Sequence, residues 1–446
     1  MMENRTICFF PVVGYQADLM QKIAKELLIN KIINKAIFLC PSFNSYNAIN
    51  DEFNKILLPK EILSIKSKDN SKEHPSVIEF EKKKLYVEEK WGINKKRNLK
   101  INLENESLVY GFYWREFLQN ENIVLMILWN GYLLPQQSLI YFINKSNVPI
   151  FFMENGYEPL SFVVDKKGIN AHSSFKYGEV QYKSDKLDDY DLYRATGLRH
   201  PSKFFKLLFR YLQVQLSILL HFKYRKYFRY EFSPSVTSKI KQIALSLTQI
   251  HKRETLLEEK RFVFFPLQVI TDSQLLINYN YSQENAIKKM AQIIDKLNED
   301  QDEPVYLCIK DHPRQETTKY FEQIKKEIVS PYIVFIPRGN IDQLLNKCAA
   351  VVTINSSVGY EALKKGKEVL VLGEAIYTGP GLGKKIGSWE ELEESLKSIL
   401  YKGKIYADSY EISQFINQYQ KYCILKHDPT AINKVVGRIV SILKER

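Results

Sequence analysis

The sequence predicts an α/β protein with two doubly wound domains, each a parallel sheet covered by helices. Three observations predict this fold class. The chain has 446 residues, which is too long for one ordinary core and suits two or three domains. Hydrophobic residues make up 45% of the chain and charged residues 26%, as in globular proteins. In both halves, short apolar runs alternate with amphipathic helices, which favours parallel sheets.

The N-terminal half opens with a β-α-β pattern. Residues 6–13 and 35–42 are short apolar runs typical of buried strands, and residues 18–31 between them have helical spacing. The first turn holds a single glycine and lacks the GxGxxG pattern, so no NAD or FAD site is predicted. The chain then continues with helical stretches in 51–108, a strand in 121–131, a helix in 136–146 and a strand in 148–157.

The C-terminal half repeats this pattern with sharper boundaries. Its expected strands and helices follow one another at 261–268, 283–299, 304–313, 315–328, 332–338, 342–349, 350–357, 358–366 and 367–374. We therefore expect an N-terminal domain of residues 1–255 and a C-terminal domain of residues 256–446. In sheets of this kind, ligands bind at the carboxyl ends of the strands.

The balance of charge indicates an anionic partner. The chain carries 64 Lys and Arg against 51 Asp and Glu, a net charge of +13. Nucleic acid, a phosphate ligand and an anionic membrane would all fit, but no nucleic-acid-binding motif is present, so nucleic acid is not predicted. The five cysteines are widely spaced and suit neither a disulfide framework nor a zinc site. With no signal peptide or membrane-spanning run, a cytoplasmic protein is expected.

Residues 203–230 have an unusual composition. They hold seven Lys and Arg, no acidic residue and many aromatic and aliphatic side chains. This pattern is typical of a basic amphipathic helix at an anionic membrane surface. The alternative is an interdomain helix whose apolar face packs on the N-terminal domain and whose lysines are solvated.

The sharpest local signal lies in residues 354–373, where a strand runs into a helix start. Free N–H groups and the positive end of the helix dipole favour an anion there. Two hydroxyl groups suit a phosphate, and a glutamate one turn further suits ribose hydroxyls. The alternative is that one serine only caps the helix. The candidate donor-binding residues of this segment are Asn355, Ser356, Ser357, Gly359 and Glu361.

A cationic group is predicted in residues 309–314, with the sequence IKDHPR. Pro313 ends the strand and leaves Lys310 and His312 at its carboxyl edge. These side chains suit the phosphates of a nucleotide, and the histidine could donate a proton to a leaving phosphate. The alternative is a structural histidine.

Two carboxylates are candidates for the reacting groups. Glu154 follows a buried strand and precedes the turn at Gly156. Desolvation there would raise its pKa toward the range in which a carboxyl group acts as a general acid or base. Asp272 follows the strand that opens the C-terminal domain. Two carboxylates flanking an anomeric carbon are what displacement with retention uses. The alternatives are a loop anchor for Glu154 and a helix cap for Asp272.

Other residues near these carboxylates complete the prediction. Asp165 is expected to be solvated or to serve a turn. Further candidate site residues are Gln268, Asn155 and Asn130. The metalloprotease, P-loop and nucleophile-elbow motifs are absent from the sequence, so no metal site is predicted.

These motifs together resemble the capsular polysaccharide biosynthesis family, specifically its KpsS/LipB-type β-Kdo transferases. The resemblance covers about residues 120–380. It implies a GT-B-like fold, with an acceptor-side N-terminal domain, a nucleotide-sugar-binding C-terminal domain and a cleft between them. The matching motifs are LWNG (128–131), ENGY (154–157), VVDKKGIN (163–170), FPLQVITDSQ (265–274), KDHPR (310–314) and INSSVGYEALKKGKEVLVLGEAIY (354–377).

The resemblance also implies an activity. It is the retaining transfer of Kdo from CMP-β-Kdo to a (lyso)phosphatidylglycerol-type lipid acceptor in capsule linker synthesis, without a metal or other cofactor. The protein would be peripheral at the cytoplasmic face of the inner membrane, an anionic surface, beside other capsule assembly proteins. Asp272 would be the nucleophile and Glu154 the acid/base. The residues implied for CMP are His312, Ser356 and Ser357, with Lys310 and Glu361.

Two alternatives stay open. The same motifs are similar to those of bacterial GT-B sialyltransferases, which use CMP donors, so CMP-sialic acid or another nucleotide sugar is a second donor. In those enzymes the acidic loop reads Glu/Asp-Asp-Gly, whereas Asn155 stands at its second place here. A different class is a non-catalytic capsule export or scaffold protein.

Overall fold

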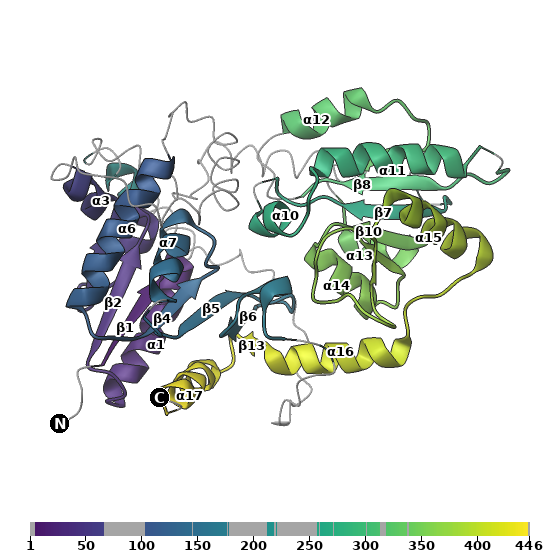
Figure 1. Cartoon of the computed structure of the whole chain (residues 1–446). Coiled ribbons are helices and arrows are strands. Elements are labelled where there is room, and N and C mark those ends of the chain that lie inside the picture. Colours follow the sequence, from purple (N-terminus) through teal and green to yellow (C-terminus); the bar gives the residue numbers. More distant parts are fainter. Residues whose placement is uncertain are drawn as a thin grey trace. The chain divides into compact units, whose positions relative to one another are not determined.

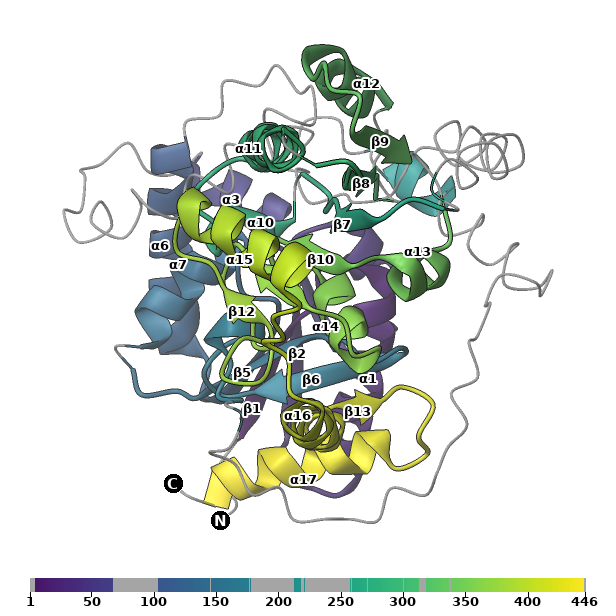
Figure 2. The same ribbon diagram turned by 90° about the vertical axis from the view of Figure 1, so that its right-hand side faces the viewer.

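The computed structural model divides the chain into two compact units, each drawn in Figures 1 and 2. The first unit contains the elements up to Ser174 and the chain from Lys421 onward. The second contains the elements from β7 through Gln420. The structure describes residues 5–66, 103–144, 146–175, 177, 212–217, 220, 257, 259–270, 272–299, 301–312, 318–336 and 339–444.

The first unit is built on a mixed sheet whose strand order is β13-β6-β5-β4-β1-β2-β3. Its strands are β1 (Thr6–Phe10), β2 (Lys35–Cys40), β3 (Asn54–Leu57), β4 (Ile123–Trp129), β5 (Ile150–Asn155), β6 (Ser161–Asp165) and β13 (Ile424–Leu425). β3, β2, β1, β4 and β5 pair in parallel, whereas β6 is antiparallel to both β5 and β13. From β3 to β6, the order is the 3-2-1-4-5-6 of a Rossmann sheet.

Helices cover both faces of this sheet because its central strands are apolar on both sides. Ile7 and Phe9 of β1 point into a core with α1 and α17, whereas Cys8 and Phe10 point into a core with α3, α6 and α7. All four side chains are fully buried. The helices of this unit are α1 (Gly14–Ile29), α2 (Phe43–Tyr46), α3 (Leu58–Lys66), α6 (Leu103–Asn120), α7 (Leu134–Ile143) and α17 (Ala431–Lys444), with a 3-10 turn at Asn170–His172.

The second unit repeats the Rossmann order with parallel pairing throughout the described sheet, as β12-β11-β10-β7-β8-β9. Its strands are β7 (Phe262–Pro266), β8 (Tyr306–Lys310), β9 (Ile333–Ile336), β10 (Ala350–Thr353), β11 (Val369–Val371) and β12 (Lys384–Lys385). The apolar faces of α11 and α15 pack on one side of the sheet. The helices are α10 (Ser273–Ile277), α11 (Gln283–Leu297), α12 (Thr318–Glu327), α13 (Ile341–Lys347), α14 (Ser357–Lys364), α15 (Trp389–Lys402) and α16 (Ser409–Tyr422).

The predicted α/β fold with two Rossmann-like domains is thus confirmed, and the structure adds two features to it. β3 and the antiparallel β6 were not predicted, because their runs are short and mixed in polarity. The chain after residue 420 returns to the first unit, where α17 packs on α1. The predicted boundary at 255/256 lies outside the described residues and does not include this return.

Candidate functional site

The polar centre of the second unit lies where the strand order reverses, beyond the carboxyl ends of β7 and β10. Gln268 donates from Nε2 to Asn355 Oδ1 at 2.8 Å, and the Asn355 backbone N–H donates back to Gln268 Oε1 at 3.3 Å. Gln283 holds the Gln268 main chain through both its amide N–H and its carbonyl oxygen. Both amide side chains are buried. The predicted residues Gln268 and Asn355 therefore form one rigid pair at the switch point, where Rossmann-type sheets bind ligands.

Asp272 lies beside this pair and caps α10. Its Oδ1 accepts from the Gln274 N–H at 2.9 Å, which is the helix cap given as the alternative role in the sequence analysis; the predicted catalytic role stays a prediction. Burial raises the pKa of Asp272, and bonds from the Gln274 N–H and the Gln268 side chain act in the opposite direction. Asn355 reaches the same turn, because its Nδ2 donates to the Gln274 carbonyl at 2.9 Å. The structure thus gathers Asp272, Gln268 and Asn355 into one network.

The start of α14 holds the two predicted serines in different ways. Ser356 is buried and caps the helix, with its Oγ accepting from the Val358 N–H at 3.2 Å, whereas Ser357 is exposed. Gly359 faces the buried ring of Tyr377, whose hydroxyl donates to the Ser356 carbonyl at 2.6 Å. A Cβ on Gly359 would lie 2.6 Å from that hydroxyl oxygen. Glycine is therefore required here for packing against Tyr377, a reason that the motif did not reveal.

The predicted cationic group lies at the end of β8. Lys310 is buried, and its Nζ donates to the Asp311 carbonyl at 3.0 Å. The His312 side chain is half-buried, and its backbone N–H donates to Asp311 Oδ1 at 2.8 Å. Glu361, on α14, is half-buried as well. Pro313 lies outside the described residues.

In the first unit, Glu154 stands at the end of β5 with both carboxylate oxygens bonded. Asn130 Nδ2 donates to its Oε2 at 2.9 Å, and the Asn155 backbone N–H and Nδ2 donate to its Oε1 at 2.7 and 3.1 Å. Asn130 holds a left-handed backbone, with φ +69°, which asparagine tolerates. The three predicted residues of this unit therefore meet, and these donors hold the Glu154 carboxylate in one orientation.

Two residues that the sequence did not indicate complete this cluster. Lys426 donates from Nζ to Asn155 Oδ1 at 2.7 Å, and Asn155 Nδ2 donates to the Tyr15 hydroxyl at 3.1 Å. The Tyr15 ring packs edge-on against Trp129 with 5.6 Å between centroids. Tyr15 comes from α1 and Lys426 from the loop after β13, so their proximity to Glu154 follows from the fold and from no local motif.

Asp165 departs from its expected exposure. It is 3% exposed, and its oxygens accept from the backbone N–H groups of Lys167, Gly168 and Ser174 and from the hydroxyls of Ser174 and Tyr422. The prediction that the Asp165 side chain is solvated is therefore wrong, and the prediction that it serves a turn is confirmed. This buried carboxylate fixes the loop after β6. Its bond from the Tyr422 hydroxyl also joins that loop to the C-terminal segment that returns to the first unit.

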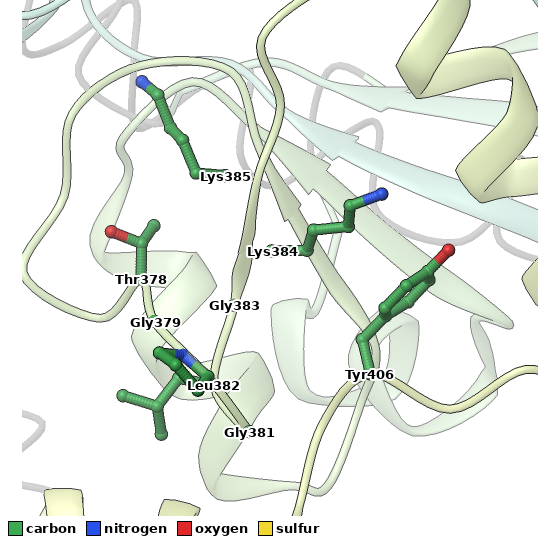
Figure 3. Close-up of a pocket in the computed structure, with 9 residues that line it drawn as sticks. Thr378, Gly379, Gly381, Leu382, Gly383, Lys384, Lys385 and Tyr406 are labelled. Carbon is green, nitrogen blue, oxygen red and sulfur yellow. The ribbon is translucent and has the colours of Figure 1, made fainter.

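A pocket of about 400 Å³ lies in the second unit, between the glycine-rich loop before β12 and Tyr406 (Figure 3). Both lysines that line this pocket form ion pairs with glutamates. Lys384 pairs with Glu391 at 3.1 Å and Lys385 with Glu374 at 2.8 Å. The lining residues are Thr378, Gly379, Pro380, Gly381, Leu382, Gly383, Lys384, Lys385 and Tyr406.

Of the basic segment 203–230, only residues 212–217 and 220 are described. Val214 is buried against Phe43 and Leu57, whereas Leu212 and Leu216 are 56% and 57% exposed. This short helical stretch thus packs one side on the first unit and turns leucines to solvent. The remainder of the segment lies outside the described residues.

Three further features bear on ligands and surroundings. In the described ranges, no group of three or more His, Cys, Asp or Glu side chains is arranged to hold a metal ion. All five cysteines are buried free thiols. Among the helices that the structure describes, none is both long enough and apolar enough to cross a bilayer.

One family model and two capsule polysaccharide proteins match much of the chain. Residues 126–407 match the family of capsule polysaccharide biosynthesis proteins. The chain is 28% identical over 249 residues to the capsule polysaccharide export protein KpsS of Escherichia coli, a match that covers 51% of this chain and 61% of that protein. It is 23% identical over 268 residues to the capsule polysaccharide modification protein LipB of Neisseria meningitidis, covering 54% and 61%. The chain thus spans about three fifths of the length of these relatives.

Among solved structures, the chain is distantly similar to a β-Kdo 2,4 transferase, the KpsC of Thermosulfurimonas dismutans. The two are 16% identical with a TM-score of 0.38, over 66% of this chain and 79% of that one. The family match extends over more than half of the sequence and includes Glu154, Asp272, Lys310 and the start of α14. This chain belongs to the capsule polysaccharide biosynthesis protein family.

Proposed function

We propose that the protein is a retaining glycosyltransferase that moves Kdo from CMP-β-Kdo to a (lyso)phosphatidylglycerol-type lipid in capsule linker synthesis. Membership of the capsule polysaccharide family supports the biosynthetic role. The observation that carries the chemistry is Asp272, a poorly solvated carboxyl group beside the Gln268–Asn355 pair at a Rossmann switch point. A nucleotide sugar bound at that edge would bring its anomeric carbon to a reactive oxygen.

The proposed reaction has two displacements. In the first, an oxygen of Asp272 attacks the anomeric carbon, and the bond from that carbon to the CMP phosphate breaks, so CMP leaves with the electron pair. In the second, an acceptor hydroxyl attacks the same carbon, its proton passes to Glu154, and Asp272 departs as a carboxylate. The proposal requires Glu154 of the first unit and Asp272 of the second to act on one sugar.

The start of α14 and the end of β8 are proposed to hold the CMP phosphate. Ser357 is exposed at the helix N-terminus, where N–H groups and the helix dipole favour an anion. Lys310 ends β8, which is two strands from β10 in the sheet order, and His312 follows shortly after it. Their side chains supply cationic and hydrogen-bond donor groups. Charge that develops on the leaving phosphate would be stabilised by these groups.

The exposed leucines of residues 212–220 support a peripheral membrane location. Leu212, Leu216 and Leu220 are exposed within a basic segment, a combination that suits insertion between anionic lipid head groups. We propose that the protein binds the cytoplasmic face of the inner membrane here. Liposome co-sedimentation tests this, because binding should require anionic lipid and be lost at high salt. Binding that survives in Leu212→Glu/Leu216→Glu would contradict it.

Donor binding is the first experiment. Thermal unfolding is measured with CMP, CDP, UDP, GDP and no nucleotide, because a ligand at a hundredfold excess over its Kd stabilises the folded state by about 2.7 kcal/mol. We expect CMP to raise Tm, and Ser357→Ala or His312→Ala to reduce the rise. A shift with UDP or GDP in place of CMP would defeat the donor assignment, and no shift at all would favour a non-catalytic role.

Turnover is the second experiment. Asp272→Ala should reduce sugar transfer from CMP-β-Kdo by at least about 10³-fold and leave the CMP-induced rise in Tm intact. Transfer at the wild-type rate would remove Asp272 from the nucleophile role. Transfer from CMP-sialic acid but not from CMP-β-Kdo would keep the mechanism and change the sugar.

A further inference from the structure

The turn between β4 and α7 has an unusual backbone. Asn130 and Gly131 follow one another with φ +69° and +87°. The left-handed region is unfavourable for residues other than glycine, so two successive residues stay there only where neighbouring groups hold them. From this turn, Asn130 Nδ2 donates to Oε2 of Glu154 at 2.9 Å. The groups that hold the turn therefore also orient the carboxylate.

Two buried glutamines at the start of α7 hold this turn from both sides. Gln136 is fully buried, and its Nε2 donates to the carbonyl of Trp129, the residue before Asn130, at 2.8 Å. Gln137 is 7% exposed, and its Nε2 donates to the carbonyl of Gly131, the residue after Asn130. The main chain of Asn130 is thus fixed between two side-chain amides of one helix.

The Gln137 side chain serves this turn alone. Its amide donates to the Gly131 carbonyl, and no donor among the residues that the structure describes reaches its buried Oε1. Methionine is close to glutamine in length and adapts its shape to a core. Gln137→Met therefore removes the bond to Gly131 and little else, which makes it the variant that isolates this contact.

We infer that Gln137, together with Gln136, is a positioning residue for the acid/base carboxylate. It holds the turn in which Asn130 meets Oε2 of Glu154, and a proton acceptor must point at the hydroxyl that it deprotonates. The inference deepens the proposed function and rests on it for the role of Glu154 as proton acceptor. The contacts that hold the turn do not depend on that role.

The contact is tested first without any substrate. Nuclear magnetic resonance of the full-length chain with isotope-labelled asparagine reports the side-chain NH₂ signal of Asn130, identified as the signal lost in Asn130→Asp. We expect this signal to shift in Glu154→Gln, because its acceptor loses its charge, and in Gln137→Met, because the turn moves. An Asn130 signal at its wild-type position in Gln137→Met would overturn the inference. Melting curves show whether each variant is folded, and Gln136→Met, which releases the other side of the turn, is the substitute if Gln137→Met is not.

Gln21 on α1 provides a matched control in the same unit. It is also a buried glutamine that holds a loop, since its Nε2 donates to the Ala48 carbonyl at 2.9 Å and its Oε1 accepts from the Asn50 N–H at 2.7 Å. This loop precedes β3 and lies at the amino end of the strands, away from the acid/base carboxylate. Gln21→Met should lower Tm as Gln137→Met does, but leave the Asn130 signal and the transfer rate unchanged.

Turnover then tests whether Gln137 acts through Glu154. Gln137→Met should lower kcat for sugar transfer about tenfold and leave the KM for the donor unchanged. The loss is smaller than in Glu154→Gln because Asn155 still donates to Oε1. The double variant Gln137→Met/Glu154→Gln should be no slower than Glu154→Gln alone, because no carboxylate is left to position. Losses that multiply in the double variant would show that Gln137 acts elsewhere and would refute the inference.

The outcomes separate this inference from the proposed function. A shifted Asn130 signal in Gln137→Met, with no transfer from CMP-β-Kdo by the wild type, would defeat the proposed function and leave the contact that holds the turn standing. Conversely, wild-type transfer in Gln137→Met, with Glu154→Gln and Asp272→Ala inactive, would leave the transferase proposal standing and this one refuted.

Discussion

The two units share one strand order but assemble their polar sites in different ways. In the second unit the side chains of Gln268 and Asn355 bond to each other, and Asp272 and Ser356 cap the helices that follow them. In the first unit, Glu154 bonds to its neighbour Asn155 and to Asn130. Tyr15 and Lys426, which bond to Asn155, come from segments 140 and 271 residues away from it. In the second unit, the two amide residues are 87 positions apart in the sequence, but each follows the end of a strand in one parallel sheet. In the first unit, a carboxylate and an ammonium are bonded to the same asparagine.

The difference also concerns what each site can do. Neutral amide pairs and helix caps make a rigid surface that holds a ligand and changes little on binding. In the first unit, Glu154 and Lys426 both bond to Asn155, and the charge of Glu154 raises the pKa of Lys426 against the lowering effect of burial. Apart from the proposed nucleophile Asp272, we therefore expect substitutions in the second unit to act mainly on folding or donor binding, and those around Glu154 in the first to act on proton transfer and acceptor binding.

The largest expected effect is on turnover. Glu154→Gln keeps the shape of the side chain but cannot accept a proton, so transfer should fall about 10²- to 10⁴-fold. Because Glu154 belongs to the first unit, the rise in Tm with CMP should stay the same. The measurement is the rate of sugar transfer at saturating donor, together with the CMP-dependent shift.

A matched control is available in the same sheet. Glu121 precedes β4, at the amino end of the strands, and pairs with Lys35 at 2.7 Å. Glu121→Gln should keep the wild-type rate. If Glu154→Gln and Glu121→Gln were equally active, Glu154 would have no acid/base role. The proposed catalytic difference between the two units would then be wrong.

The second effect is on stability and separates two glycines. Gly359 on α14 packs on Tyr377, and the Cβ of Gly359→Ala would lie within 2.7 Å of three ring and hydroxyl atoms. Overpacking of this kind costs about 1–3 kcal/mol, more than the 0.5–1 kcal/mol that alanine gains in a helix. The free energy of unfolding should fall by about 1–2 kcal/mol, as measured by urea denaturation.

Gly437 provides the opposite case in the first unit. It lies in the interior of α17 and is exposed, and a Cβ added there would have nothing within 4 Å. Gly437→Ala should therefore raise the free energy of unfolding by about 0.5–1 kcal/mol. If Gly359→Ala left the free energy of unfolding unchanged, Tyr377 would have moved aside without a cost in stability. The close packing at the start of α14 would then not explain why glycine stands there.

The sequence predicted the second unit better than the first, and for a physical reason. Its central strands are short, almost entirely buried and parallel, so each appears as an apolar run that ends in polar residues. Those polar ends are Gln268, His312 and Asn355, and the Rossmann order brings the first and last of them together. Local pattern and site geometry coincide there, which is why the motif residues and the network agree.

The first unit shows what a local pattern cannot reveal. Glu154 and Asn155 were found because they end a buried strand. Tyr15 was not, because the sequence around it resembles an ordinary turn before a helix, and Lys426 was not, because it is an isolated lysine outside any recognised motif. Its position depends on the pairing of β13 with β6, a contact between segments more than 250 residues apart.

The smallest expected effect is a gain in stability at Asp272. Its pKa is raised by burial, so the folded state holds the proton more readily than the unfolded chain does. The ionised carboxyl therefore destabilises the folded protein. This penalty is absent below the ordinary value of 3.8 and grows as pH rises from there through the raised pKa of the folded state. Asp272→Asn removes the charge but keeps a good helix cap.

Thermal unfolding from pH 4 to pH 8 measures this difference. We expect Asp272→Asn to melt about 2 °C above the wild type at pH 7–8 and to approach the wild-type Tm near pH 4, although its transfer activity is lost. A gain in stability that accompanies a loss of activity is expected for a strained catalytic group. If Asp272→Asn melted lower at neutral pH, the bonds from Gln274 and Gln268 would outweigh desolvation. Asp272 would then be a cap that stabilises α10, and the neutral, prebuilt site of the second unit would contain no reactive carboxylate.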